Sequence, residues 1–140
     1  MRRLFNRKRK RKGFTLLEVI IVIIIVSVLA SLALPRFFKT VEYSRAMEAL
    51  QSLSTLRQSM NRCYITQNAY TNCGNINELD VEDPATSPGA HFSYSFLSVG
   101  VTLFTVRANR LTNEGGSTAS FITIDQSGVR SGGGAFAGIK

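Results

Sequence analysis

The chain has 140 residues, the length of one domain, and a formal net charge of +8 with an isoelectric point near 10.1. The first 13 residues hold eight of the 17 lysines and arginines and none of the nine acids, so the chain from residue 14 on is formally neutral. The net positive charge therefore comes from the N-terminal segment, and the rest of the chain is not a basic domain. One histidine, no paired carboxylates in a catalytic frame, no glycine-rich phosphate loop and no HExxH motif leave no residues for an enzyme. We therefore expect neither catalysis nor a cofactor.

An apolar run follows the basic segment and extends from Phe14 to Leu34, with Glu18 as its only charged residue. At about 1.5 Å per residue, a helix of this length crosses the roughly 30 Å hydrocarbon layer of a bilayer. Val19 to Val28 is rich in β-branched residues, which in water favour a strand. An open strand in lipid would leave its backbone N–H and C=O groups unpaired, so the run predicts a transmembrane helix.

The basic segment has two explanations. Arg7 to Lys12 has the composition of a nucleic-acid or nuclear-targeting patch, but clustered Lys and Arg beside a spanning segment hold that end in the cytoplasm. A secretory signal peptide cut after Ser31-Leu32-Ala33 is the alternative, and it would release a soluble domain. The length of the apolar run, Glu18 within it and Pro35 beside the cut count against that alternative. We predict a single-pass protein with its N-terminus inside and its C-terminal domain outside.

The junction between the two segments reads Lys12-Gly13-Phe14-Thr15-Leu16-Leu17-Glu18. It resembles the leader junction of type IV pilins and type II secretion pseudopilins, and the resemblance continues through Pro35 and Glu42 to Ala46. It implies that a prepilin peptidase cleaves between Gly13 and Phe14 and then methylates the amine of Phe14. It also implies a bacterial inner-membrane protein whose partners are other copies of itself, the membrane and an ATPase-driven inner-membrane assembly platform.

Glu18 is a carboxylate inside the predicted spanning segment, where a charge costs a few kcal/mol or more and marks function. Its place in the first turn lets the helix dipole offset part of this cost. The resemblance implies that Glu18 of an incoming subunit pairs with the Phe14 amine of a neighbour and sets the axial register. Pairing of Glu18 with its own Phe14 amine is the alternative.

Pro35 lacks the N–H that a continuous helix uses and disfavours helical geometry in Leu34, so we expect either a bend or the end of the membrane helix there. Beyond it, apolar residues recur at spacings of three or four, which favours an amphipathic helix with polar residues such as Glu42 and Arg45 on its other faces. The apolar set is Phe38, Val41, Met47, Leu50, Leu53, Leu56 and Met60. The sequence thus predicts one helix from residue 15 to about residue 62.

Cys63 and Cys73 bound a segment rich in Asn and Thr, which we expect to be a loop. In a domain outside the cytoplasm the two thiols would form a disulfide. Closing this ring would stabilise the fold by roughly 3 kcal/mol. Free thiols and a metal site with His91 are the alternatives, but two Cys and one His make an incomplete tetrahedral set, so no metal is predicted.

An acidic segment follows within residues 74–90, a connecting loop by its Asn, Pro and Gly content. Its acids could bind Ca²⁺, but they lack the EF-hand spacing, and solvated carboxylates are the more common explanation. These acids are Glu78, Asp80, Glu82 and Asp83.

From Phe92 the apolar period changes to two, which is typical of strands. Strands are expected within residues 92–97, 103–108 and 121–124, a short fourth strand after the turn at Asp125 to Gly128, and a mobile terminus at Gly132 to Gly134. Consecutive strands with short connections indicate an antiparallel meander whose apolar face covers the helix. The predicted class is α+β, with a long N-terminal helix on a three- or four-stranded antiparallel sheet, and the resemblance implies the same type IV pilin fold.

The predicted organisation has four parts: a cleaved leader at residues 1–13, a transmembrane and assembly helix at 14–35, its amphipathic continuation at 36–62, and residues 63–140, which form the head together with 36–62. The predicted function is a structural subunit of a type IV pilus or pilus-like filament, at the cell surface or spanning the periplasm. A type II secretion pseudopilin and an anchored monomeric periplasmic binding module are the alternatives. The sequence lacks an aromatic and basic stripe, so we predict no specific nucleic acid partner.

Overall fold

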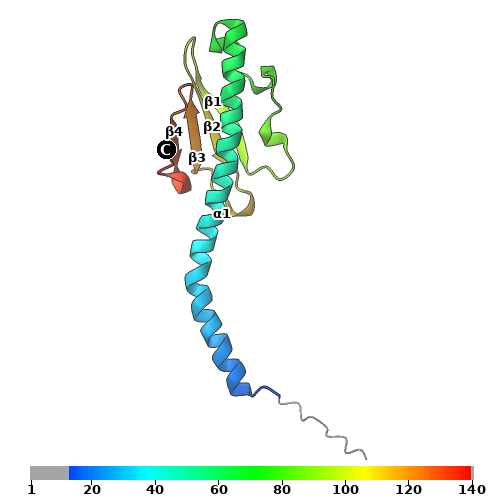
Figure 1. The fold of residues 1–140 in the computed structure, drawn as a ribbon, viewed down its shortest axis with the longest axis vertical. Coiled ribbons are helices and arrows are strands. Elements are labelled where there is room, and N and C mark those ends of the chain that lie inside the picture. Colours follow the sequence, from blue (N-terminus) through cyan, green and yellow to red (C-terminus); the bar gives the residue numbers. More distant parts are fainter. Residues whose placement is uncertain (1–12, 140) are drawn as a thin grey trace, which may run out of the picture. The chain divides into compact units, whose positions relative to one another are not determined.

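The computed structural model describes residues 13–139, so the predicted basic leader, apart from Gly13, lies outside the described residues. The chain divides between Phe38 and Lys39 into two compact units, which are described separately; we call the second unit the head. One long helix runs through both units, and four strands follow it in the head (Figure 1). The elements are α1 (Leu16–Gln67), β1 (Phe92–Val99), β2 (Phe104–Arg110), β3 (Phe121–Asp125) and β4 (Arg130–Gly133).

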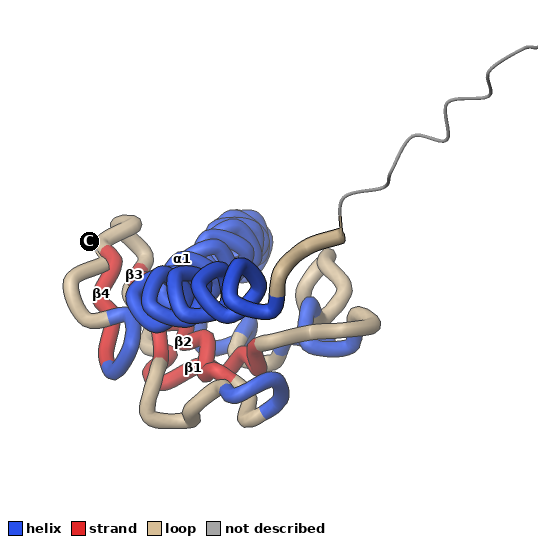
Figure 2. The backbone as a smooth tube through the Cα atoms, turned by 90° about the horizontal axis from the view of Figure 1, so that it is seen from below, coloured by secondary structure: helices blue, strands red, loops and turns tan. Residues whose placement is uncertain are grey.

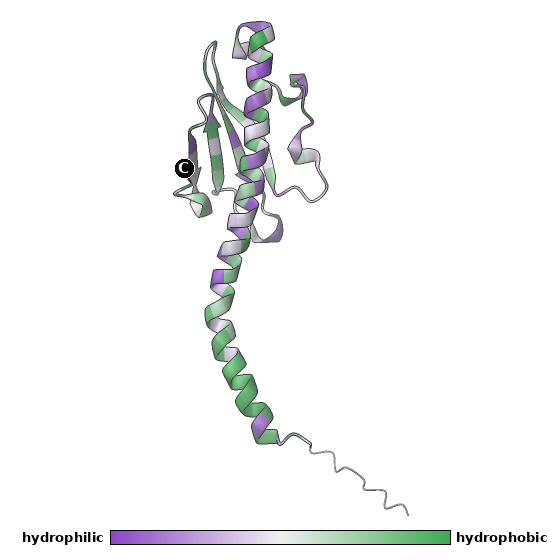
Figure 3. Cartoon of the chain, in the orientation of Figure 1, coloured by the Kyte–Doolittle hydropathy of each residue, from purple (hydrophilic) through white to green (hydrophobic). Residues whose placement is uncertain are grey.

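The first unit consists of the N-terminal part of α1. The hydroxyls of Ser27 and Ser31 donate hydrogen bonds to the carbonyl oxygens of Ile23 and Val28, at 2.6 and 2.7 Å, so these polar groups are satisfied within the helix. The helix continues through Pro35, so the helix end that we considered there is not observed. By length and composition alone, this helix can cross a membrane. Hydrophobic residues surround most of its first part (Figure 3).

The sheet of the head is an antiparallel meander with strand order β1-β2-β3-β4, as the order of the strands in the sequence predicts. A bulge in β1 between Phe96 and Ser98 shifts its register with β2. The α1 helix lies against one face of the sheet (Figure 2). The head is therefore an α+β unit.

The core of the head lies between α1 and the inner face of the sheet. In β2 the buried positions alternate with half-buried ones, so Val106 and Ala108 point to the core, together with Ile122 and Ile124 of β3. Burying each of the larger side chains contributes roughly 1.5–3 kcal/mol. Leu53, Leu56 and Met60 supply the matching face of α1.

The buried stripe of α1 differs from the predicted one at its start. Met47 and Phe38 are exposed, whereas Ala46 and Ala49 are completely buried. The interpretation that took Phe38 and Met47 as core residues was therefore wrong: the buried face of α1 begins with the small side chains of Ala46 and Ala49.

The ends of two elements also differ from the prediction. The α1 helix ends at Gln67, so Cys63 lies within it and the loop starts later than residue 63. The C-terminal glycines form no mobile tail: Gly132 and Gly133 pair with β3. A Cβ atom on Gly133 would lie 2.4 Å from the ring of Phe121, so this close approach needs glycine. The following turn buries Phe136 in the core.

Candidate functional site

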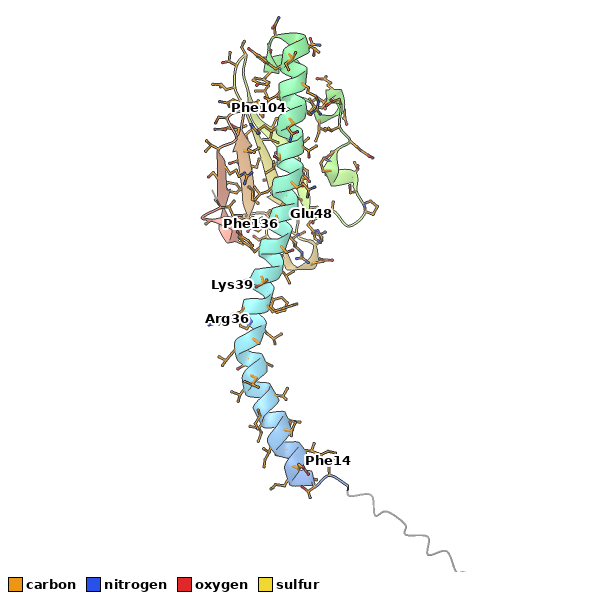
Figure 4. All side chains as sticks on the ribbon, in the orientation of Figure 1. Phe14, Arg36, Lys39, Glu48, Phe104 and Phe136 are labelled. Carbon is orange, nitrogen blue, oxygen red and sulfur yellow. A yellow bond between two sulfur atoms is a disulfide. The ribbon has the colours of Figure 1, made fainter. Side chains whose placement is uncertain are left out.

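The residues predicted for processing and pairing lie at the start of α1. Gly13 and Phe14 precede the helix; Gly13 is exposed, and Phe14 is 82% exposed. The hydroxyl oxygen of Thr15 accepts a hydrogen bond from the backbone N–H of Glu18 at 3.2 Å, as an N-cap residue does. Glu18 therefore lies in the first turn, where the positive end of the helix dipole stabilises a carboxylate. Figure 4 shows Phe14 at this end of the helix.

The apolar side chains that follow have no cover in the structure. Residues 16–28 are all exposed, as are the large apolar residues from there to Phe38. A continuous apolar surface of this extent marks a region that contacts lipid or other protein. Pro35 lies inside this part of the helix.

In the head, a buried charge pair joins α1 to the sheet. The guanidinium of Arg110, at the end of β2, is fully buried, and its Nε and Nη2 donate to the two carboxylate oxygens of Glu42 at 3.1 and 3.0 Å. This two-point contact is the strongest arrangement for such a pair. The hydrogen bond from Arg110 is the largest cause that lowers the pKa of Glu42 below its usual value, and Arg45 adds to it.

The same arginine holds the loop after β2. Its Nη1 donates to the carbonyl oxygens of His91 and Leu111, at 3.1 and 3.0 Å, and to the side-chain oxygen of Asn113 at 3.0 Å. The His91 ring lies between the carboxylates of Glu48 and Glu114, with nitrogen-to-oxygen distances of 3.5 and 3.2 Å. The arrangement is structural: within the head, it fixes the end of β2 and the loop after it to α1.

The sequence interpretation missed this pair because it assigned Glu42 to the exposed side of the helix. The period of two in β2 contained the missing signal: Phe104, Val106 and Ala108 face inward, so Arg110 must face inward too. A buried arginine needs a carboxylate. Glu42 is the acid that α1 supplies to it.

At the other end of the head, two contacts fasten the long connecting segment to α1. Cys63 and Cys73 form a disulfide, as predicted from the sequence. The guanidinium of Arg62 donates to both oxygens of Asp80 at 2.6 and 2.8 Å, and the hydroxyl of Ser59 donates to the same carboxylate. Asp80 thus binds one cation and one hydroxyl of the protein itself. Across residues 13–139, no three His, Cys, Asp or Glu side chains are grouped to hold a metal ion.

We expect the head to lose stability in acid. The hydrogen bonds from Arg62 are the largest cause that lowers the pKa of Asp80 from 3.8 to about 2, and the pKa of Glu42 is also lowered. Groups with a lowered pKa stabilise the fold above their ordinary pKa, and this contribution is lost as the pH falls through the folded-state value. Thermal unfolding of the full chain in detergent should therefore occur at lower temperature at about pH 2.5 than at about pH 6. Asp80→Asn should weaken this dependence, and an unchanged pH profile would contradict the assignment.

Comparison with known proteins identifies the family. Residues 8–34 match the family described as the prokaryotic N-terminal methylation motif, and residues 35–120 match the family described as type IV minor pilin ComP, DNA uptake sequence receptor. The chain is 32% identical over 116 residues to a probable minor fimbrial protein of Dichelobacter nodosus. This match covers 81% of this chain and 72% of that protein.

A second group of relatives belongs to secretion systems. The chain is 30% identical over 82 residues to the type II secretion system core protein G of Aeromonas hydrophila and 32% identical over 79 residues to that of Escherichia coli K12. These matches cover 59% and 56% of this chain, but only 57% and 54% of the two relatives. The chain therefore spans a little over half of the length of these proteins.

A solved structure agrees in fold. The crystal structure of the Neisseria meningitidis non-core minor pilin PilV aligns with a TM-score of 0.50 at 16% identity, over 65% of this chain and 85% of that one. At this identity the likeness concerns the fold alone, a long helix packed on an antiparallel sheet. The family matches and the fimbrial relative together show that this chain belongs to the type IV pilin and pseudopilin family, as a structural protein and not an enzyme.

Proposed function

We propose that this chain is a filament subunit that is stored in the bacterial inner membrane and polymerises through the first part of α1. The observation that carries the proposal is the exposed apolar surface of the first part of α1, with one carboxylate in its first turn. Such a surface suits lipid in the stored subunit and other helices in the filament. When a subunit leaves the membrane and enters the filament, its helix exchanges one apolar environment for another, so its surface need not change.

Processing by a prepilin peptidase would create the second charge that assembly uses. Gly13 has no side chain, so a protease can approach the backbone closely, and both Gly13 and Phe14 are exposed. Hydrolysis of the peptide bond between them leaves a carboxylate on the leader and frees the amine of Phe14. The same enzyme then transfers a methyl group to this amine from a sulfonium donor, which becomes a thioether, and the amine loses one proton, so the nitrogen stays basic but is less hydrated. The new N-terminus is then a cation next to an apolar surface.

The carboxylate of Glu18 is the partner that we assign to this cation. In the assembled filament, Glu18 of an incoming subunit pairs with the Phe14 amine of its neighbour, and the pair fixes the axial register. The N-cap formed by Thr15 supports this role, because it orders the turn that carries Glu18. Pairing within one chain can precede this contact, since Phe14 lies four residues before Glu18, just ahead of the first turn of α1.

The topology that we propose has the leader in the cytoplasm and the head outside. The basic residues of the leader support it through the excess of Lys and Arg on cytoplasmic flanks. The disulfide between Cys63 and Cys73 supports it independently, because disulfides persist in oxidising compartments. Prepilin peptidase and the inner-membrane assembly machinery with its ATPase are the partners on the inner side.

Mass spectrometry of the native protein tests the processing step. We expect the mature chain to begin at Phe14 and to carry one added methyl group on its amine. Gly13→Leu should retain the leader, because the larger side chain obstructs the protease, whereas Gly74→Ala in the head should be processed normally. A native chain that keeps residues 1–13, or that begins at Leu34 after signal-peptide cleavage, would contradict the proposal.

The family match over residues 35–120 raises DNA binding by the head as a second candidate function. The charges of the head do not favour it: its described residues carry seven Lys or Arg and eight Asp or Glu, and Arg45, Arg62 and Arg110 lie in ion pairs. DNA affinity depends on cations that neutralise phosphates. We therefore expect a mobility-shift assay at about 0.15 M salt to detect no binding. A shifted complex that weakens steeply with salt would favour the second candidate.

A further inference from the structure

The described part of the first unit contains two charged side chains, Glu18 and Arg36. They lie eighteen residues apart, which at 3.6 residues per turn is five full turns, so they point to the same face of the helix. Everything between them is apolar or, at Ser27 and Ser31, satisfied by the helix itself. One helix face thus has an acidic group at its start and a basic group at its end.

An open groove lies beside the basic group. It is lined by Leu29, Leu32, Ala33 and Arg36, the spacing that places four residues on one side of a helix. Ala33 is small, which leaves room between the larger side chains. The groove therefore has an apolar part next to Leu32 and a cationic end at Arg36, whose position on the helix Figure 4 shows.

The N-terminal turn of the chain has the complementary pattern. Phe14 is an aromatic residue that is 82% exposed, and Glu18 follows four residues later. Leu32 and Arg36 are also four residues apart, in the same direction. When two parallel α1 helices are shifted by eighteen residues, Glu18 of one lies level with Arg36 of the other. Phe14 precedes the first residue of α1 by two positions, so it lies near the level of Leu32.

We propose that, in the filament, the N-terminal turn of one copy docks into this groove on a second copy. The Phe14 ring contacts Leu29 and Leu32, and the Glu18 carboxylate accepts hydrogen bonds from the Arg36 guanidinium. The inference rests on the proposed function, since it needs parallel copies in a polymer. It adds to that function a second contact of Glu18, with a different neighbour from the one that supplies the amine.

Both groups have the capacity for this contact. A carboxylate has two oxygens with about four acceptor sites, so Glu18 can bind a guanidinium and an amine at once. A guanidinium has five N–H donors, so contacts of Arg36 within its own chain leave donors for a neighbour. Helix packing without the shift would instead place Glu18 beside Glu18 and Arg36 beside Arg36, and such like-charge contacts are destabilising.

The shift gives the contact a role in controlling assembly. Eighteen residues of helix correspond to about 27 Å, close to the roughly 30 Å thickness of the hydrocarbon layer. Stored subunits that span the membrane lie at the same depth, so this contact cannot form between them. It forms only when one copy has moved outward by nearly a membrane thickness, which restricts the docking to filament growth.

Charge variants of the full-length protein test the contact through the amount of filament that cells produce. We expect Arg36→Glu to reduce filament yield roughly tenfold or more, because a charged hydrogen bond becomes a repulsion, and Arg36→Lys to retain most of it. Lys39→Glu is the matched control: it makes the same change from a positive to a negative charge, but the residue eighteen positions before it is Ile21, which has no carboxylate. Equal yields for Arg36→Glu and the wild type would overturn the proposal.

Cysteine cross-linking tests the shift itself. Thr15→Cys together with Ala33→Cys places two thiols at the same level of neighbouring helices, so oxidation of sheared filaments should give covalent ladders of two, three and more subunits. Thr15→Cys with Val26→Cys, and each single variant, should give no ladder. Filaments that form normally but show no ladder for the first pair contradict the docking, whereas failure of the wild type to form filaments contradicts the proposed function instead. If the double variant does not assemble into filaments, the filament yields of the Arg36 variants decide whether the docking occurs.

Discussion

Substitution of Glu18 by alanine will lower filament assembly by roughly a hundredfold, as the loss of about 3 kcal/mol from an interfacial charge pair would produce. The physical reason is that the amine of Phe14 on the neighbouring subunit would remain charged in an apolar contact with no counter-charge. Membrane insertion should persist, because the substitution makes the helix more apolar. The measurement is the amount of sheared filament relative to the total amount of the protein in the cell.

Two controls separate the role of the Glu18 charge from a general effect of any substitution in this part of the helix. Val19→Ala removes apolar atoms from the adjacent residue and should assemble nearly normally, and Glu18→Asp keeps the charge and should recover part of the assembly. Leader cleavage should be measured in each variant, since an uncleaved chain cannot supply the amine. Normal filament yield from processed Glu18→Ala protein would show that the axial register is set elsewhere.

Substitution of Glu42 by alanine will lower the free energy of unfolding of the head by about 3–5 kcal/mol. The guanidinium of Arg110 is completely buried and would lose the two-point contact that neutralises it. The remaining acceptors at His91, Leu111 and Asn113 are neutral oxygens, which satisfy donors but supply no negative charge. Chemical unfolding of the full chain in detergent, followed by near-ultraviolet circular dichroism, measures the loss.

The matched control is Glu48→Ala, which removes a carboxylate six residues further along the same helix. Glu48 is 56% exposed on its side chain and its recorded partner is His91, so we expect a change within about 1 kcal/mol. The double variant Glu42→Leu with Arg110→Met removes both charges and should recover much of the lost stability. Equal effects of Glu42→Ala and Glu48→Ala would contradict the importance of the buried pair.

The architecture could be predicted from the sequence because two periods of apolar residues are strong local signals. Spacings of three and four identify α1 beyond Pro35, and the period of two with short turns identifies the meander. The periods do not show which apolar residues of α1 face the sheet or where the last strand ends. Ala46 and Ala49 are buried and Met47 is exposed, and Gly133 pairs with Phe121 of β3, whose ring leaves no room for a Cβ atom.

The buried ion pair of Glu42 and Arg110 was also missed, because it depends on how segments far apart in the sequence pack together. Glu42 is polar and sits on an amphipathic helix, so its residue type alone indicates solvent. Its partner Arg110 is 68 residues away in the sequence, and only the pairing of β1 with β2 and the packing of α1 bring the two together. A contact of this separation becomes visible only once the sheet is assembled.

The residues of the predicted processing and assembly site, by contrast, could be identified from the sequence alone. Gly13, Phe14 and Glu18 lie within six consecutive residues, so their pattern is complete in the sequence, and the structure adds the N-cap at Thr15 and the exposure of Phe14. Their roles remain predictions, as does the place of Pro35 in assembly. These roles concern contacts between copies, and the register between copies is not a property that one chain displays.

The central claim is that this chain forms the repeating subunit of a filament through the first part of α1. Immunogold electron microscopy of cell-surface and periplasmic filaments, with an antibody against the head, tests it most directly. The account predicts gold particles along the length of thin filaments from wild-type cells and none on filaments from cells that lack the gene. Labelling confined to membranes, with the purified protein remaining as dispersed monomers, would contradict it.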